Sequence, residues 1–197
     1  QPRALALFLS LASTHPDKIK KYASLASAYA VVFDQPFPRN WPHHQVPKKD
    51  VPVSLSSLAD RFGDMVKAHS TRKLEYDPSQ LSVTELKFVI DHPLSTSELE
   101  WARERESFRR SGFDKIFSSI QYDHPRLRAS VFSWPQGKYS LESIRSRGAI
   151  CVDQAYFSSM VGKAKGIPTL PFVGQGSGGG HAWFGFLKSP GRWETDC

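Results

Sequence analysis

Residues 148–197 read GAICVDQAYFSSMVGKAKGIPTLPFVGQGSGGGHAWFGFLKSPGRWETDC, and the spacing of their apolar and glycine residues indicates the architecture. Apolar residues recur at helical spacing at Val152, Ala155, Tyr156, Met160 and Ala164. Gly166 suits a left-handed helix cap, and Pro168 cannot continue a helix. We therefore predict a helix that begins at about Cys151 and ends near Lys165.

The predicted helix carries a cysteine at its positive end. Gly148 permits a sharp turn into the helix, and Cys151 follows at the first turn, where unpaired amides and the helix dipole stabilise a thiolate. Asp153 in the first turn and Lys163 and Lys165 in the last match the same dipole. An isolated cysteine is more often a small buried hydrophobe, so the reactive interpretation depends on the residues that follow.

Three strands are predicted after the helix. A glycine-rich loop joins the first two strands, and a turn at residues 188–191 joins the last two. The three strands are Leu170–Val173, His181–Leu187 and Arg192–Cys197. The order helix, strand, strand, strand predicts a helix packed on an antiparallel sheet.

The final turn fixes which side chains share a face of this sheet. If Lys188 pairs with Gly191, Trp183 falls opposite Asp196. His181 then shares the face of Asp196 and is its diagonal neighbour. We expect the cysteine helix to pack on that face, which would bring thiol, imidazole and carboxylate together as nucleophile, base and orienting acid.

These residues resemble the transglutaminase-like superfamily, a branch of the papain-like cysteine enzymes. The resemblance is carried by G-x-x-C-x-D-x-A, then G-I-P, then H-A-W, then W-x-x-D, between residues 148 and 196. It implies that Cys151 is the nucleophile, His181 the base and Asp196 the third catalytic residue. The family also has an upstream donor to the oxyanion, for which Gln136 and Tyr139 are candidates beside the backbone amide of Cys151.

The fold class that follows is α+β. We expect residues 1–110 to form a mainly helical region of unknown role, and residues 111–197 to form a transglutaminase-like core whose sheet is truncated at the C-terminal end. Prolines crowd residues 34–53, which predicts an extended loop. Elsewhere apolar spacing or capping residues predict helices over residues 4–12, 19–33, 55–68, 85–91, 95–108, 113–122 and 141–147.

Composition excludes several classes of protein. The chain has 197 residues, a net charge of +7 and 40% hydrophobic residues, enough for a core. No apolar run approaches the length of a membrane span, and basic residues are interleaved with acidic ones, so we expect neither a membrane-spanning segment nor nucleic-acid binding. Two cysteines cannot form a disulfide scaffold or a cysteine-based zinc site.

Other polar residues receive simpler interpretations. Asp153 and Gln154 could contact substrate, but a first-turn carboxylate more often caps its helix. His43 and His44 are adjacent and point to opposite sides of an extended chain, which argues against a zinc site. The glycines of residues 174–180 lack the lysine and helix of a phosphate-binding loop. We expect no metal or organic cofactor, because the proposed nucleophile and base are both side chains.

The sequence therefore predicts a cysteine-dependent peptidase, amidase or protein-glutamine acyltransferase that acts on a peptide or protein substrate. Hydrolysis and transamidation both remain open, as do the oligomeric state and the compartment. The chain begins without Met, so we expect an excerpt or processed piece, and a removed upstream signal would place it in a bacterial envelope or outside the cell. The alternative is a non-catalytic transglutaminase-like binding or scaffold module.

Overall fold

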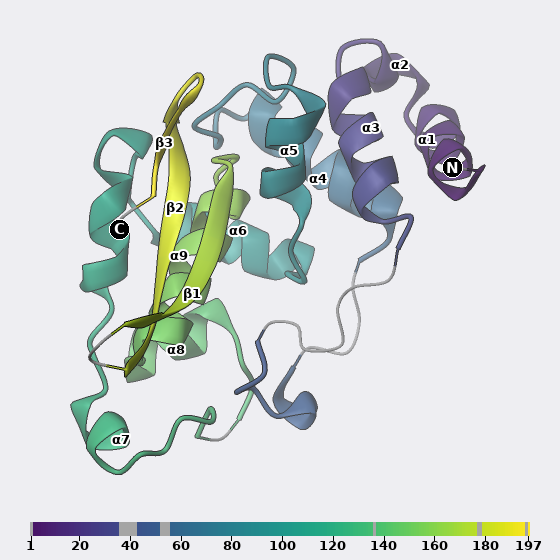
Figure 1. Cartoon of the computed structure of the whole chain (residues 1–197). Helices are drawn as coiled ribbons and strands as arrows, with labels where there is room; N and C mark the ends of the chain where they lie inside the picture. The colour runs from purple at the N-terminus through teal and green to yellow at the C-terminus, as the bar shows by residue number, and fades with distance from the viewer. Residues whose placement is uncertain (1, 36–42, 52–55, 136, 177–178, 196) are drawn as a thin grey trace.

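The computed structural model describes residues 2–35, 43–51, 56–135, 137–176, 179–195 and 197. It shows an α+β fold in which the described helices pack against one face of a three-stranded antiparallel sheet and leave most of its other face uncovered (Figure 1). The helices are α1 (Pro2–Thr14), α2 (Pro16–Ile19), α3 (Ala23–Val32), η1 (Lys48–Asp50), α4 (Leu58–Ser70), α5 (Val83–Ile90), α6 (Thr96–Arg105), η2 (Arg110–Ser119), α7 (His124–Arg128), α8 (Leu141–Arg147) and α9 (Cys151–Ala164). The strands are β1 (Thr169–Gly176), β2 (Gly179–Ser189) and β3 (Arg192–Glu194).

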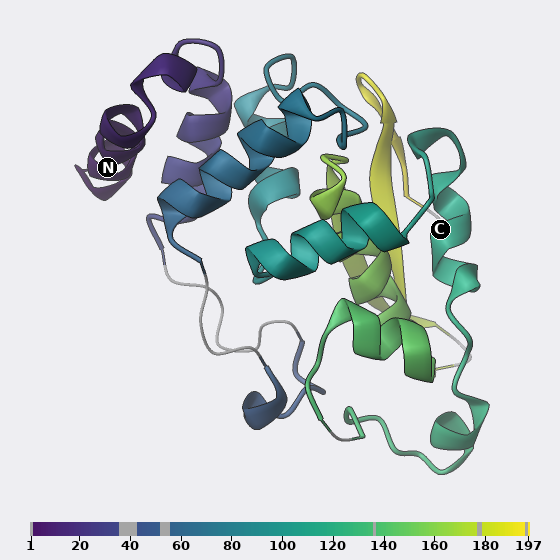
Figure 2. The ribbon, with the colours of Figure 1, turned by 180° about the vertical axis from the view of Figure 1, so that it is seen from behind.

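Helix α9 lies at the centre of the molecule. The sheet covers one side of α9, and α6 crosses it on the side away from the sheet, as the view from behind shows (Figure 2). All residues of α9 from Val152 to Ala164 are buried. The predicted amphipathic helix is therefore a central helix without a solvent face, and Cys151 is its only residue that is not fully buried.

Helices α5 and α6 begin at two of the capping residues that the sequence offers, whereas α4 begins at Leu58, later than the start predicted from apolar spacing. Ser57 caps α4, Ser95 caps α6, and Ser82 forms a capping box with Glu85 at the start of α5. Such caps satisfy amides that have no partner within the helix.

Two predicted helices differ in detail. In α1 Leu11 is buried and Phe8 packs against the core, whereas Leu5 and Leu9 are 60% and 56% exposed, so only part of the apolar stripe predicted there faces the core. The helix predicted over residues 113–122 is the 3₁₀ element η2, which the non-helical backbone of Gly112 interrupts. None of the described helices has the length and apolar character needed to cross a lipid bilayer.

The strand register departs from the predicted one. Ser189, rather than Lys188, closes the last turn by pairing with Arg192, and a shift of register follows between Leu187 and Ser189. Further along the strands, Phe184 and Cys197 exchange two backbone hydrogen bonds of 3.2 and 3.4 Å. The expected pairing of Lys188 with Gly191 is therefore wrong, and Asp196, which that register placed opposite Trp183, lies outside the described residues.

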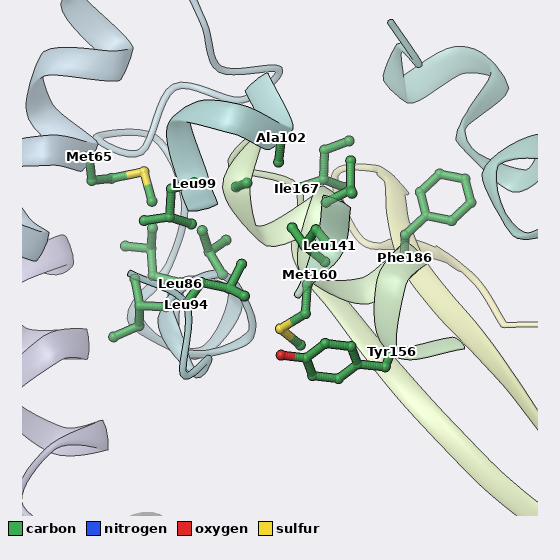
Figure 3. Close-up of a cluster of buried hydrophobic side chains, with 14 of the residues drawn as sticks. Met65, Leu86, Leu94, Leu99, Ala102, Leu141, Tyr156, Met160, Ile167 and Phe186 are labelled. Atoms are coloured by element: carbon green, nitrogen blue, oxygen red, sulfur yellow. The ribbon is translucent and has the colours of Figure 1, made fainter. Parts of the chain in front are cut away.

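One hydrophobic core extends through both regions of the chain. Figure 3 shows Met160 of α9 among side chains from α4, α5, α6, α8 and β2. A partly buried ion pair joins the same layers: Arg103 binds Asp64 through two bonds of 2.9 and 2.7 Å, and its Nε donates to the carbonyl of Ala164 at 2.7 Å. The C-terminal end of α9 is thus fixed to α4 and α6. The division of the chain into regions 1–110 and 111–197 stays a prediction.

Candidate active site

The chain segment before Cys151 is fixed by a parallel bridge. Ala149 donates to the carbonyl of Gln121 at 2.9 Å and accepts from the amide of Asp123 at 3.0 Å. Gly148 turns the chain into this bridge with φ +82°, and a Cβ there would lie 2.7 Å from the backbone oxygen of Gln121. Glycine is required at this position for both reasons, and α9 then begins at Cys151 as predicted.

The half-buried side chain of Cys151 lies beside a small apolar cluster. Ile150, Val152, Ala155 and Ala182 form this cluster, and Tyr122 packs against it together with Cys151. The Tyr122 hydroxyl interacts with the backbone amide and the thiol of Cys151, and burial followed by the charge of the sulfur raises the pKa of this tyrosine. The sulfur thus lies at an open helix end with a phenol next to it.

Asp153 is the centre of a buried polar network. Its Oδ2 accepts from Arg126 at 2.6 Å, and its Oδ1 accepts from the Tyr139 hydroxyl at 3.1 Å and lies 3.2 Å from Nε2 of His43. The carboxylate is fully buried, so it requires a cation and hydrogen-bond donors to offset the loss of water. The expectation that Asp153 caps its helix is therefore wrong: the side chain binds three distant residues instead.

His43 attaches the segment 43–51 to α9. Its Nδ1 accepts from the backbone amide of Gln45 at 3.3 Å, so the neutral ring carries its proton on Nε2 and donates toward Asp153 and Tyr139. Two backbone bonds, from Trp134 to Gln45 at 2.9 Å and from Tyr139 to Asp50 at 2.8 Å, continue the attachment. Sequence reasoning missed this role, because a contact across 110 residues leaves no local pattern.

Tyr139 is not available as a donor to an oxyanion. Burial raises its pKa well above the ordinary value, as does the charge of Asp153, and its hydroxyl is bound within the network. Gln136, the other candidate, lies outside the described residues. The third predicted donor, the backbone amide of Cys151, contacts the Tyr122 hydroxyl, and its role toward an oxyanion stays a prediction.

His181 lies on β2, on the face of the sheet opposite to α9. Its neighbour Ala182 is 2% exposed and packs on α9, and successive side chains of a strand point to opposite faces. The exposed imidazole instead stacks on Trp183, with ring centroids 6.1 Å apart. The expectation that α9 covers the face of His181 is wrong, and Asp196 lies outside the described residues. Their catalytic roles stay predictions.

A cavity of about 310 Å³ adjoins the apolar cluster beside Cys151. It lies between α9, the two strands β1 and β2, and the segment that His43 attaches. Its lining consists of His43, His44, Val152, Ala155, Tyr156, Pro171, Phe172, Val173 and Ala182. A mainly apolar cavity next to a thiol is suited to holding an organic group close to the sulfur.

The part of the chain that the structure describes holds no group of three His, Cys, Asp or Glu side chains that could bind a metal ion. Comparison with models of protein families, with curated proteins and with solved structures found no match. The local geometry is therefore the basis for assigning a function.

Proposed function

We propose that this chain is a transglutaminase-like cysteine enzyme that transfers or hydrolyses acyl groups of peptide or protein amides. One observation carries the proposal: α9 is buried along its length except at Cys151, whose thiol lies at the positive end of the helix. A nucleophilic side chain at the positive end of a helix, partly exposed while the rest of that helix is buried, is the arrangement an attacking thiolate requires.

The reaction would proceed in two steps. The Cys151 sulfur attacks the amide carbonyl, His181 takes the thiol proton, and the oxyanion accepts a hydrogen bond from the Cys151 amide. The tetrahedral intermediate then breaks its C–N bond as His181 returns the proton to the leaving amine, which gives a thioester. Water or a second amine attacks the thioester and restores the thiol, while Asp196 orients the imidazole.

This mechanism places a specific demand on β2. The imidazole of His181 must reach the side of the sheet on which Cys151 lies, whereas the ring now stacks on Trp183. Gly179 and Gly180 precede it and have no side chain to obstruct a turn of the strand end; a Cβ built on Gly179 meets no atom within 4 Å. We propose that the strand end turns when the substrate binds.

Substitution of the nucleophile tests the proposal. Cys151→Ala should abolish release of amine from a peptide amide and formation of the thioester, whereas Cys197→Ala should retain both. His181→Ala should slow the reaction by at least the 10²-fold that general-base catalysis supplies. Activity that survives Cys151→Ala would disprove the mechanism.

The alternative is a non-catalytic binding or scaffold module, which the placement of His181 away from α9 favours. Iodoacetamide labelling separates the two functions. Cys151 and Cys197 are both half-buried, so they are matched for access. An activated Cys151 should be labelled at least tenfold faster than Cys197 at neutral pH, and His181→Ala should reduce this preference. Equal rates would support the scaffold.

A further inference from the structure

The cavity beside Cys151 has the chemistry of a site for an apolar side chain. Its volume of about 310 Å³ lies at the small end of ligand cavities, which range over roughly 300–1,000 Å³. Ala155 and Ala182 contribute only methyl groups to its walls, which leaves the space open. Val173, at 74% exposed, lies at its rim.

The lining offers no charge to a ligand. No Asp, Glu, Lys or Arg belongs to it; both ring nitrogens of His43 are already occupied, by Gln45 on one side and by Tyr139 and Asp153 on the other, and the second histidine, His44, is exposed to solvent. A charged group placed there would lose its water without gaining a buried partner of opposite charge. The cavity therefore discriminates in favour of neutral apolar groups.

The cavity and the thiol share their walls. Val152, Ala155 and Ala182 line the cavity and also form the cluster on which Cys151 packs. Cys151 is not itself part of the lining, but a group held in the cavity contacts the same side chains on which Cys151 packs. A long aliphatic or aromatic side chain fits this position, because apolar surface removed from water contributes about 25 cal/mol per Å² to its binding.

We propose that this cavity binds an apolar side chain of the peptide substrate, close to the amide that Cys151 attacks, and so selects peptides with Leu-like or Phe-like residues there. The inference rests on the proposed function for the identity of the ligand. It also assigns a role to the N-terminal region, since His43 and His44 complete the wall that faces α9.

Binding to Cys151→Ala protein tests the inference without turnover. The probes are four capped peptides, acetyl-Ala-X-Ala-amide with X as Leu, Phe, Glu or Lys, measured by calorimetry. The Leu and Phe peptides should bind at least tenfold tighter than the Glu and Lys peptides. Equal affinity for all four, or no binding of Leu and Phe at millimolar concentration, would overturn the inference.

Two variants in the Cys151→Ala background locate the binding. Ala182→Leu should fill part of the cavity and weaken the Phe peptide at least tenfold, with the melting temperature reported alongside. Because a buried substitution can impair folding, Val173→Asp at the exposed rim provides a second variant with the same expected loss. Val31→Asp, also exposed but on α3, is the control. Undiminished binding in both cavity variants would contradict the assignment.

The two proposals fail in different ways. If Cys151→Ala protein prefers the apolar peptides but wild-type protein releases no amine from any peptide amide, the enzyme proposal fails and the binding site stands. If wild-type protein processes all four peptides with equal kcat/KM, the cavity assignment fails and the enzyme proposal stands.

Discussion

Nε2 of His43 lies 3.2 Å from Oδ1 of Asp153, although 110 residues of chain separate them. The contact joins the proline-rich part of the chain to the first turn of α9, two residues beyond the proposed nucleophile. The position of Cys151 thus depends on a residue from the N-terminal region. Loss of the polar network around Asp153 should therefore change the stability of the fold and the accessibility of the segment 43–51.

Asp153→Asn should lower the free energy of unfolding by about 3–5 kcal/mol, the cost of leaving one partner of a buried ion pair without its counter-charge. Arg126 is buried and donates to this carboxylate at 2.6 Å. Urea unfolding followed by circular dichroism measures the change. Asp114→Asn, at an exposed site on η2, should change stability by under about 0.5 kcal/mol. Equal losses in the two variants would show that the network adds no stability.

His43→Ala should release the segment 43–51 from α9. Lys48 and Lys49 in this segment are exposed, so trypsin should cleave after them several times faster once the attachment is lost. His44→Ala is the matched control, because His44 is the exposed neighbour. Mass spectrometry of the early fragments identifies the cleavage site, and identical cleavage rates in both variants would contradict the attachment.

Arg103→Ala should destabilise the fold by about 1.5–3 kcal/mol, because the partly buried Asp64 would lose two charge-assisted hydrogen bonds from the guanidinium. Arg103→Lys should recover only part of the loss, since an ammonium cannot form the paired contact. Arg105→Ala, exposed on the same helix, serves as the control for urea unfolding. Full recovery with lysine would mean that charge alone accounts for the interaction.

The buried Lys163 should make stability rise with pH. Burial lowers its pKa from 10.5 to about 8, and its Nζ donates to the carbonyl of Phe88 at 2.5 Å. Between these two pH values the unfolded chain binds the proton that the folded chain has lost, so the free energy of unfolding increases as pH rises. Below pH 8 both states hold the proton and the penalty, about 3 kcal/mol, is present in full.

Lys163→Met removes this contribution. Its unfolding free energy relative to wild type should therefore fall by about 3 kcal/mol as pH rises from 8 to 10.5. Lys87→Met, at an exposed position on α5, should show a constant difference over the same range. Unfolding measured at five pH values gives both curves, and parallel curves for Lys163→Met and wild type would refute the assignment.

Gly148→Ala should destabilise the protein by about 1–3 kcal/mol, because it combines a positive φ with a contact to the backbone of Gln121. The same substitution should alter the labelling rate of Cys151, three residues later. Gly112→Ala is the control, since a Cβ there meets no atom within 4 Å and its φ is −132°. A stable Gly148→Ala protein with unchanged labelling would show that the turn is not needed.

The limits of α9 could be predicted from neighbouring residues, whereas contacts between residues far apart in the sequence could not. Gly148, Gly166 and Pro168 determine the limits of the helix through backbone geometry alone, so the sequence reveals them. The predicted sheet face failed because β2 is apolar at nearly every position from Trp183 to Leu187, which hides the alternation that would identify the buried face. The shift of register after Leu187 also contributed, because a slip of one residue moves the side chains of a strand to the opposite face of the sheet.

The same distinction between local and distant residues applies to the candidate site. The placement of Cys151 at a helix start follows from its immediate neighbours, whereas the partners of Asp153 come from positions 43, 126 and 139. No pattern of spacing connects these positions. A carboxylate in the first turn of a helix buried on all sides does require a cation, and that requirement is the signal that could have prompted a search for one.

The burial of α9 on every side has a consequence for hydrogen exchange. Because no face of the helix meets solvent, its amide protons should exchange with deuterium only when the whole molecule unfolds, and their protection should report its global stability. The amide of Cys151 lies outside the internal ladder of the helix and contacts the Tyr122 hydroxyl instead, so it should exchange sooner, whenever that local contact opens. A deuterium pulse would thus distinguish the reactive end from the helix behind it within a single peptide.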